Sequence, residues 1–226
     1  MMDLNDDNEP LTVAGSLDEH LAAAQSLISQ RLGDGQRNLV AVAGPPAVGK
    51  SSFAETLVDR LNADAPDTAV LLPMDGFHLD NAMLDQKGLL DRKGAPPTFD
   101  FEGFASLLSR VRNSSVEHYL PVFDRALDIS VAGARSVPET ARTIVAEGNY
   151  LLLDRNPWHQ LKGLFDLSIF IEASLDQLRS RLIERWIEHG YDMAGAEARA
   201  LLNDIPNAEH VMAHRLSADL ICQQAA

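Results

Sequence analysis

The first quarter of the chain contains the pattern G-x-x-x-x-G-K-[ST], in the segment Gly44-Pro45-Pro46-Ala47-Val48-Gly49-Lys50-Ser51. The five residues before it, Leu39 to Ala43, are all apolar, which predicts a strand buried on both faces, as in a parallel sheet. After it, apolar residues recur at helical spacing, at Phe53, Leu57, Val58 and Leu61. A glycine-rich loop between a buried strand and an amphipathic helix is the context in which this pattern binds phosphate.

Each residue type in this loop suits polyphosphate binding. Glycines let the backbone curl so that several N–H groups point at one polyphosphate, and the positive end of the following helix dipole adds to the attraction. Lys50 is expected to reach the β- and γ-phosphates, and Ser51 to offer its hydroxyl to Mg²⁺. We therefore expect the nucleotide on residues 44–52, which adds Ser52 to the pattern. The alternative is an ordinary Gly/Pro turn with a solvated lysine.

Buried strands and amphipathic helices alternate along the rest of the chain. Further strands are predicted at 69–74, 143–146, 167–172 and 219–222. Helices are predicted at 16–32, where Ser16 and Glu19 form a capping box, at about 101–112, from Ser174 to Gly190, and over about 193–215. This alternation predicts an α/β protein with the P-loop NTPase three-layer fold, in which helices cover both faces of a mainly parallel central sheet.

We expect one folded domain preceded by a tail. Residues 1–15 are acidic and polar and are interpreted as a mobile tail. Residues 16–226 show no repeat, low-complexity tract or linker. They are therefore expected to form a single domain, with an N-terminal helix at 16–32 and a nucleotide-binding core at 36–222.

Charge and cysteine content exclude several classes of protein. The 33 acidic and 19 basic residues give a formal net charge of −14, which argues against binding to nucleic-acid phosphates. Cys222 is the only cysteine, so the chain has no internal disulfide framework and no cysteine-based zinc site. Its first ten residues carry four acids and no base, unlike a secretory or transit peptide, and no apolar run approaches the roughly 18 residues of a membrane span. The sequence thus predicts a soluble, cytoplasmic protein without nucleic-acid or membrane partners.

Two acidic residues directly follow predicted strands. Asp75 follows the strand 69–74 and Glu147 follows the strand 143–146. Ligands of open α/β sheets bind at the carboxyl ends of the strands, so both acids should face the site made by Lys50 and Ser51. Two carboxylates beside a metal–triphosphate suit phosphoryl transfer, because one can hold Mg²⁺ while the other accepts the proton of an attacking hydroxyl. The alternative is that each acid only caps the next segment.

Five segments downstream of the loop carry short motifs: Asp75-Gly76-Phe77-His78, residues 93–100 (KGAPPTFD), Pro121-Val122-Phe123-Asp124-Arg125, Val145-Ala146-Glu147-Gly148 and Arg181-Leu182-Ile183-Glu184-Arg185. In this order and spacing they resemble the uridine kinase, phosphoribulokinase and bacterial pantothenate kinase family. Within that family the chain most resembles proteins described as fructose transport system kinases or nucleoside kinase-like proteins, through residues 147–153 (EGNYLLL), Pro157-Trp158 and Pro206-Asn207-Ala208. The resemblance covers about residues 36–222.

The resemblance implies an ATP-dependent kinase of a small molecule, with Mg²⁺ as cofactor. It implies that Asp75 is the base that takes the proton of the acceptor hydroxyl and that Glu147 is a ligand of magnesium or of the acceptor, although the two roles could be exchanged. Arg181 and Arg185 lie one helical turn apart, and on a mobile lid they would close over the transferring phosphoryl group. The alternative for these arginines is a solvated helix flank paired with Glu184 and Glu188.

The acceptor is expected among the residues Asp75, His78, Lys93, Asp124, Arg125, Glu147 and Asn149. Two departures from the family bear on its identity. Uridine kinases usually carry His-x-Arg where this chain has the segment 126–129 (ALDI), and pantothenate kinases have a histidine at the position of Arg125. A sugar or polyol of the fructose type is therefore the leading acceptor, and a nucleoside or pantothenate-type precursor is the alternative. Structural explanations for His78 (a loop histidine) and Arg125 (a salt bridge to Asp124 or Asp128) stay open, and Trp158 and Trp186 are assigned to packing.

A function of another class also stays open, namely a switch or assembly factor that hydrolyses ATP without a small acceptor. The loop-rich segment 75–100 and the two lid arginines favour the kinase, since exclusion of water separates transfer from hydrolysis. The segment 91–94 (DRKG) fits a D-x-x-G switch pattern, but so short a string arises by chance and the Asn-Lys-x-Asp motif of GTPases is absent. The sequence leaves the oligomeric state open, a homodimer included.

Overall fold

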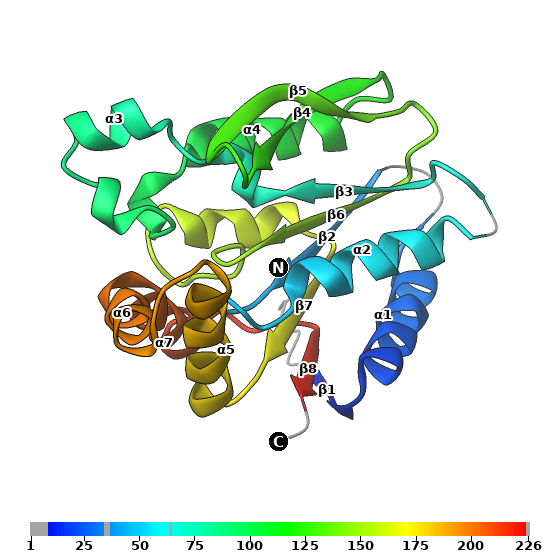
Figure 1. Cartoon of the computed structure of the whole chain (residues 1–226). Helices are drawn as coiled ribbons and strands as arrows, with labels where there is room; N and C mark the ends of the chain where they lie inside the picture. The colour runs from blue at the N-terminus through cyan, green and yellow to red at the C-terminus, as the bar shows by residue number, and fades with distance from the viewer. Residues whose placement is uncertain (1–8, 34–36, 64, 225–226) are drawn as a thin grey trace.

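A computed structural model describes residues 9–33, 37–63 and 65–224 of the chain. Its centre is a six-stranded, fully parallel sheet with the strand order β1-β8-β7-β2-β6-β3 (Figure 1). In chain order these strands are β1 (Leu11–Gly15), β2 (Asn38–Ala43), β3 (Ala69–Pro73), β6 (Thr143–Gly148), β7 (Leu167–Glu172) and β8 (Leu220–Gln224). The sheet confirms the predicted P-loop α/β architecture.

Side chains of β2 alternate between two hydrophobic cores, because successive residues of a strand point to opposite faces of a sheet. Leu39, Ala41 and Ala43 pack into one core with α4 (Phe101–Arg112) and the 3-10 helix η4 (Trp158–Leu164). Val40 and Val42 pack into the other core with α1 (Leu17–Arg31) and α2 (Lys50–Leu61). Helices therefore cover both faces, which explains why this strand is a continuous apolar run.

Shorter elements gather at one end of the strands, at the left in Figure 1. The loop after β3 forms the 3-10 helix η1 (Met74–Phe77), α3 (Asn81–Gln86), and two further 3-10 helices, η2 (Leu90–Arg92) and η3 (Pro96–Thr98). On the other side lie α5 (Leu175–Glu188), α6 (Met193–Arg199), and α7 (Ile205–Ala213). The π-helical turn η5 (Ala200–Asp204) joins α6 to α7, so the helical stretch predicted over 193–215 is three segments.

The prediction of a mobile tail at residues 1–15 is wrong for its last five residues. Leu11 to Gly15 form β1, which pairs in parallel with β8 over the whole of its length, from Leu11 opposite Leu220 to Gly15 opposite Gln224. The Val13 carbonyl also accepts a 3.0 Å hydrogen bond from the buried His20 ring. The strand was missed because it is only five residues long and directly follows an acidic, polar stretch, while an edge strand is held mainly by backbone hydrogen bonds. Residues 1–8 of the predicted tail lie outside the described residues.

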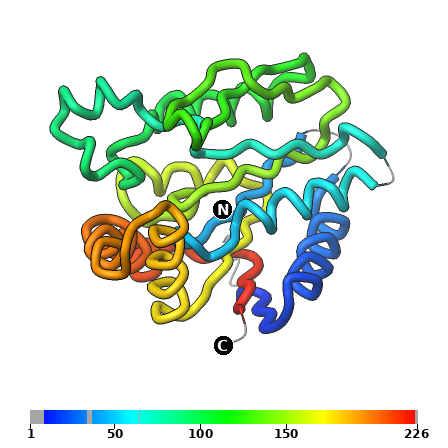
Figure 2. The backbone as a smooth tube through the Cα atoms, viewed as in Figure 1, coloured from blue at the N-terminus to red at the C-terminus, as the bar shows by residue number. Residues whose placement is uncertain are grey.

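A β-hairpin that the sequence patterns did not predict lies over η1. Its strands are β4 (His118–Asp124) and β5 (Ile129–Val137), which pair antiparallel apart from the main sheet. The hairpin sits so close that a Cβ atom at Gly76 would lie 2.3 Å from the Pro121 carbonyl oxygen. Figure 2 shows the hairpin (green) and the segment 175–213 (yellow to orange-red) on opposite sides of the strand ends. Within the described part of the chain, no helix is long and apolar enough to cross a membrane.

Candidate active site

The loop between β2 and α2 has the backbone conformation that its glycines permit. Gly44 and Gly49 have φ values of 157° and 90°, and Ala47 also lies in the left-handed region at φ 63°. At Gly44 a Cβ atom would lie 2.5 Å from the carbonyl oxygen of Ile171 in β7, so only glycine fits there. Helix α2 begins at Lys50, which directs its first backbone N–H groups toward the loop. This arrangement is the anion cradle that the pattern predicts.

Lys50 is held inside the loop rather than extended into solvent. Its side chain is only 6% exposed, and Nζ donates a 2.9 Å hydrogen bond to the carbonyl oxygen of Pro45. Burial lowers the pKa of Lys50, while the nearby charges of Glu147 and Asp75 act in the opposite direction. The predicted cation and the two predicted carboxylates therefore form one electrostatic cluster at the strand ends.

Glu147 is a buried carboxylate near the carboxyl end of β6, 7% exposed and close to Lys50. Burial is the main cause that raises its pKa to about 7; the Lys50 charge acts against this increase and the Asp75 charge adds to it. Hydrogen bonding to the Ser51 side chain favours the ionised form. A cation that binds beside Glu147 would therefore stabilise the ionised form of its carboxylate.

Because of this raised pKa, we expect the protein without ligands to lose stability as the pH rises. The folded state keeps a proton on Glu147 that the unfolded state releases near pH 4.5, so the contribution is complete below pH 4.5 and is lost as pH rises through about 7. Relative to its value below pH 4.5, the free energy of unfolding should be lower at pH 7.5 by about 2–3 kcal/mol. Glu147→Gln should flatten the slope of Tm between pH 5 and 7.5, measured by calorimetry in buffer without Mg²⁺. An equally steep slope in this variant would contradict the assignment.

The residues around Ser51 fit a magnesium ion. A hydroxyl and one or two carboxylates are the oxygen ligands that Mg²⁺ uses beside substrate phosphates, and the raised pKa of Glu147 indicates a carboxylate lacking full compensation. Among residues 9–33, 37–63 and 65–224, no group of three or more His, Cys, Asp and Glu residues could hold a metal by itself. The ion would therefore depend on the phosphates for much of its coordination.

Asp75 lies in η1, directly beyond the end of β3. Its Oδ2 accepts a 2.9 Å hydrogen bond from Nη2 of Arg125, which belongs to the hairpin connection and is 72% exposed. The close contact of the hairpin with Gly76 brings these two side chains together. An ion pair this exposed is weak, so a bound ligand can displace the arginine.

One cavity of about 770 Å³ joins the loop to most of the predicted acceptor residues. Its lining includes Pro46 together with the predicted residues Asp75, His78, Lys93, Arg125, Asn149 and Arg185. The cavity lies between the hairpin side and the C-terminal helix side of the strand ends, since it is lined from both. Space for an acceptor is therefore continuous with the phosphate loop.

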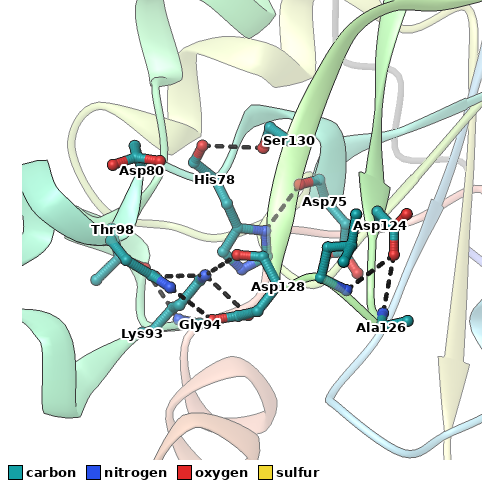
Figure 3. A network of polar contacts seen from close by, with 12 residues as sticks. Asp75, His78, Asp80, Lys93, Gly94, Thr98, Asp124, Ala126, Asp128 and Ser130 are labelled. Atoms are coloured by element: carbon teal, nitrogen blue, oxygen red, sulfur yellow. Dashed lines mark hydrogen bonds and ion pairs between the residues drawn. The ribbon is translucent and has the colours of Figure 1, made fainter.

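His78 is held in one orientation at this cavity. Its ring lies between those of Phe99 and Phe123, with centroid distances of 4.1 and 4.5 Å, and Nδ1 donates a 2.7 Å hydrogen bond to the Asp75 carbonyl oxygen (Figure 3). Burial lowers the pKa of His78, so the ring is neutral at pH 7. Its Nε2 is then an acceptor without a partner among the described residues.

Lys93 is already neutralised where it meets the cavity. Its Nζ contacts Asp128 Oδ1 at 2.8 Å and donates a hydrogen bond to the Asp128 carbonyl oxygen (Figure 3). It also donates a hydrogen bond to Asn81 Oδ1. It also lies 5.0 Å from the centroid of the Phe123 ring. Lys93 thus joins the 90–94 loop to the hairpin.

Two of the predicted acceptor residues, Asp124 and Glu147, do not line the cavity, and neither does the predicted lid residue Arg181. Asp124 caps the hairpin turn, where its Oδ1 accepts hydrogen bonds from the backbone N–H groups of Ala126 and Leu127 (Figure 3). Arg181 donates a 2.7 Å hydrogen bond to Gln224, whose amide donates in turn to the Val48 carbonyl oxygen of the phosphate loop. Arg181 therefore supports the loop from outside, while Arg185 one turn later faces the cavity.

The cavity-wall residues that sequence patterns missed include four on the C-terminal helix side, namely Trp186, Asn203, Asp204 and Asn207. Trp186 was assigned to packing alone, but its indole Nε1 donates a 2.6 Å hydrogen bond to Asp204, which also pairs with Arg185 at 2.9 Å. Asn207 is 6% exposed, and no described residue hydrogen-bonds to its side chain. The Pro-Asn segment at 206–207 was the only signal that could have indicated it.

Comparisons with known proteins agree with this geometry. A family model described as "Phosphoribulokinase / Uridine kinase family" matches residues 39–226, which include the phosphate loop and both strand-end carboxylates. The Escherichia coli (strain K12) protein YggC is 38% identical over 205 residues, 90% of this chain and 82% of YggC. A "putative uridine kinase", C227.14 of Schizosaccharomyces pombe, is 32% identical over 197 residues, 84% of each chain. The crystal structure of a "putative fructose transport system kinase" from Silicibacter sp. TM1040 is 45% identical with a TM-score of 0.85, covering 89% of this chain and 98% of that one.

Proposed function

Because the chain belongs to the phosphoribulokinase/uridine kinase family, and so is an ATP-dependent small-molecule kinase, we propose that its acceptor is a sugar or another polyol. The observation that carries the proposal is the cavity of about 770 Å³ that runs from Pro46 to Asp75 and His78. A small molecule in this cavity lies beside a polyphosphate bound to the loop. The description of the Silicibacter relative as a fructose transport system kinase supports a sugar of this type.

In this proposal Asp75 takes the proton of the acceptor hydroxyl. The hydroxyl oxygen forms a bond to the γ-phosphorus of ATP while the bond from that phosphorus to the β–γ bridging oxygen breaks, and ADP leaves. Lys50 neutralises charge on the β- and γ-phosphates, and Arg185 contacts the transferring group from the lid side. Mg²⁺ held by Ser51 and Glu147 would supply further neutralisation of the phosphate oxygens.

The charges of the cavity favour a neutral acceptor. Three cationic side chains of its wall already have carboxylate partners, in the pairs Lys93–Asp128, Arg125–Asp75 and Arg185–Asp204. The buried or half-buried groups of the wall that have no hydrogen-bond partner among the described residues include the uncharged Nε2 of His78 and the amide of Asn207. Neutral donors and acceptors that converge on one cavity match the hydroxyl groups of a polyol.

One observation favours an acceptor that carries an acid, such as pantothenate. Arg199 lines the cavity and has no carboxylate partner among the described side chains; it packs over the Trp186 ring with its Cζ 5.1 Å from the centroid. Arg199 is exposed, however, so its charge is well screened. We therefore rank this acceptor second.

The proposal is tested by ADP release from Mg–ATP against a panel of sugars, polyols, glycerate, nucleosides and pantothenate. Strong stimulation by one sugar or polyol is the expected result. Stimulation by glycerate or pantothenate would support the kinase activity but contradict a sugar or polyol as the acceptor. Steady ATP hydrolysis that no compound stimulates would favour a hydrolytic switch instead.

Loss of the Asn207 amide should weaken acceptor binding. Asn207→Ala removes a buried amide that can donate to and accept from a hydroxyl, so the acceptor KM should rise roughly fivefold to tenfold while the ATP KM stays constant. Steady-state kinetics with the best panel compound measure both constants. Glu209→Ala, at an exposed position of the same helix, is the matched control and should leave both constants unchanged. An unchanged acceptor KM in Asn207→Ala would remove this residue from the acceptor site.

A further inference from the structure

Asp204 holds the one predicted phosphoryl-contacting arginine that faces the cavity. Its Oδ2 accepts hydrogen bonds from Arg185 Nη2 at 2.9 Å and from Trp186 Nε1 at 2.6 Å, so one carboxylate oxygen binds two consecutive residues of α5. The Asp204 side chain is 15% exposed, which strengthens the ion pair relative to a surface pair.

Asp204 is the last residue of the π-helical turn η5 and contacts α5. The residue before it, Asn203, contacts the 90–94 loop instead. Asn203 accepts a 3.1 Å hydrogen bond from Arg92 Nε and donates one of 2.7 Å to the Lys93 carbonyl oxygen. The turn is therefore fastened both to α5 and to the 90–94 loop. π turns are rare, and they are found frequently at functional sites. Here the turn fixes the position of the Asp204 carboxylate against two neighbouring segments.

The position of Arg185 leaves most of its donors available to a ligand. Only Nη2 is used, and Arg185 Nε and Nη1 have no partner among the described residues. Arg185 lines the same cavity as Pro46 of the phosphate loop. Its charge also acts on Lys50, lowering the pKa of that amine, which places the guanidinium within electrostatic range of the phosphate site.

We propose that Asp204 is a positioning residue that orients the Arg185 guanidinium toward the terminal phosphate of ATP. The inference rests on the proposed role of Arg185. The carboxylate fixes one edge of the guanidinium, so the remaining N–H groups stay directed into the cavity before the nucleotide binds. A planar guanidinium held in this way loses less conformational freedom when it contacts the phosphate.

The test compares the affinities of Mg–ADP and of Mg²⁺ with β,γ-imido-ATP, by calorimetry, because only the second nucleotide presents a γ-phosphate. Arg185→Ala should reduce the preference for the imido nucleotide by roughly tenfold. Asp204→Asn, which keeps an oxygen able to accept the Trp186 hydrogen bond, should reduce it by roughly threefold to fivefold. Asp176→Asn, an exposed carboxylate in the first turn of the same helix α5, is the matched control and should not change it.

The double variant Arg185→Ala/Asp204→Asn separates positioning from a structural role. If Asp204 acts through Arg185, the double variant should show the same preference as Arg185→Ala alone. Equal losses for both nucleotides in Asp204→Asn, accompanied by a lower Tm, would overturn the inference in favour of a structural contact. An unchanged preference in Arg185→Ala would instead remove Arg185 from the phosphate site and overturn the proposed role on which the inference rests.

Discussion

Replacing Lys50 with alanine should lower the rate of phosphoryl transfer by at least roughly 10³-fold, the upper range for loss of one preorganised charge-stabilising donor. Lys50 is the cation buried in the loop, 6% exposed and held against the Pro45 carbonyl oxygen, so no other side chain of the loop can replace its charge. Coupled ADP release with the best acceptor measures the effect.

The fold should survive this substitution. Burial lowers the pKa of Lys50, which means that the charged form of the amine is less favourable in the folded protein than in water. Removing this charge should therefore cost the fold little stability. Tm should therefore change by only a few degrees, and circular dichroism should be unaltered. Lys87→Ala, at an exposed position after α3, is the control for general effects of removing a lysine. Normal turnover in a folded Lys50→Ala variant would contradict the nucleotide site.

Asp75→Asn should lower kcat by roughly 10²–10⁴-fold if Asp75 is the base that accepts the hydroxyl proton. The amide keeps the shape of the side chain and can still contact Arg125, but it cannot take the proton. The KM values for ATP and acceptor should change much less than kcat, since the contacts that bind both substrates stay in place.

Two comparison variants make this prediction specific. Asp85→Asn, an exposed aspartate on α3, should behave as the wild type. Glu147→Gln should raise the Mg²⁺ requirement more than Asp75→Asn does, because the Glu147 carboxylate lies beside Ser51 and Lys50. A loss below tenfold in Asp75→Asn, together with a larger loss in Glu147→Gln, would assign the base to Glu147.

Much of the nucleotide side followed from local sequence. The apolar run 39–43, the glycines at 44 and 49 and the helical spacing after Lys50 are local signals, and each reflects a requirement of burial or backbone conformation. Asp75 and Glu147 could be placed near the loop because parallel strands end at the same edge of a sheet. The α/β class and the central strands were therefore predictable from the sequence.

The acceptor side depended on contacts between distant segments. The hairpin was missed because most of β5 is exposed and gives little hydrophobic alternation, yet it brings Arg125 to Asp75. β1 was hidden because its five residues follow directly on an acidic, polar stretch. Asp124 was assigned to the acceptor site from its motif, although its carboxylate caps the hairpin turn. Helical spacing predicted that Arg181 and Arg185 act as one pair, but Arg181 hydrogen-bonds to Gln224 beside the phosphate loop and Arg185 to Asp204 at the cavity.

The place where a polyphosphate can bind follows from the sequence, since binding requires only a short stretch of backbone with a fixed conformation and one lysine. Which side chains surround the proposed acceptor cavity depends on the folding of the whole chain. Asp204 and Asn207 reach the cavity through a π turn between two helices, and His78 keeps a free Nε2 because of two aromatic rings and one carbonyl oxygen. Such positions arise from packing between segments far apart in the chain, which no local pattern encodes.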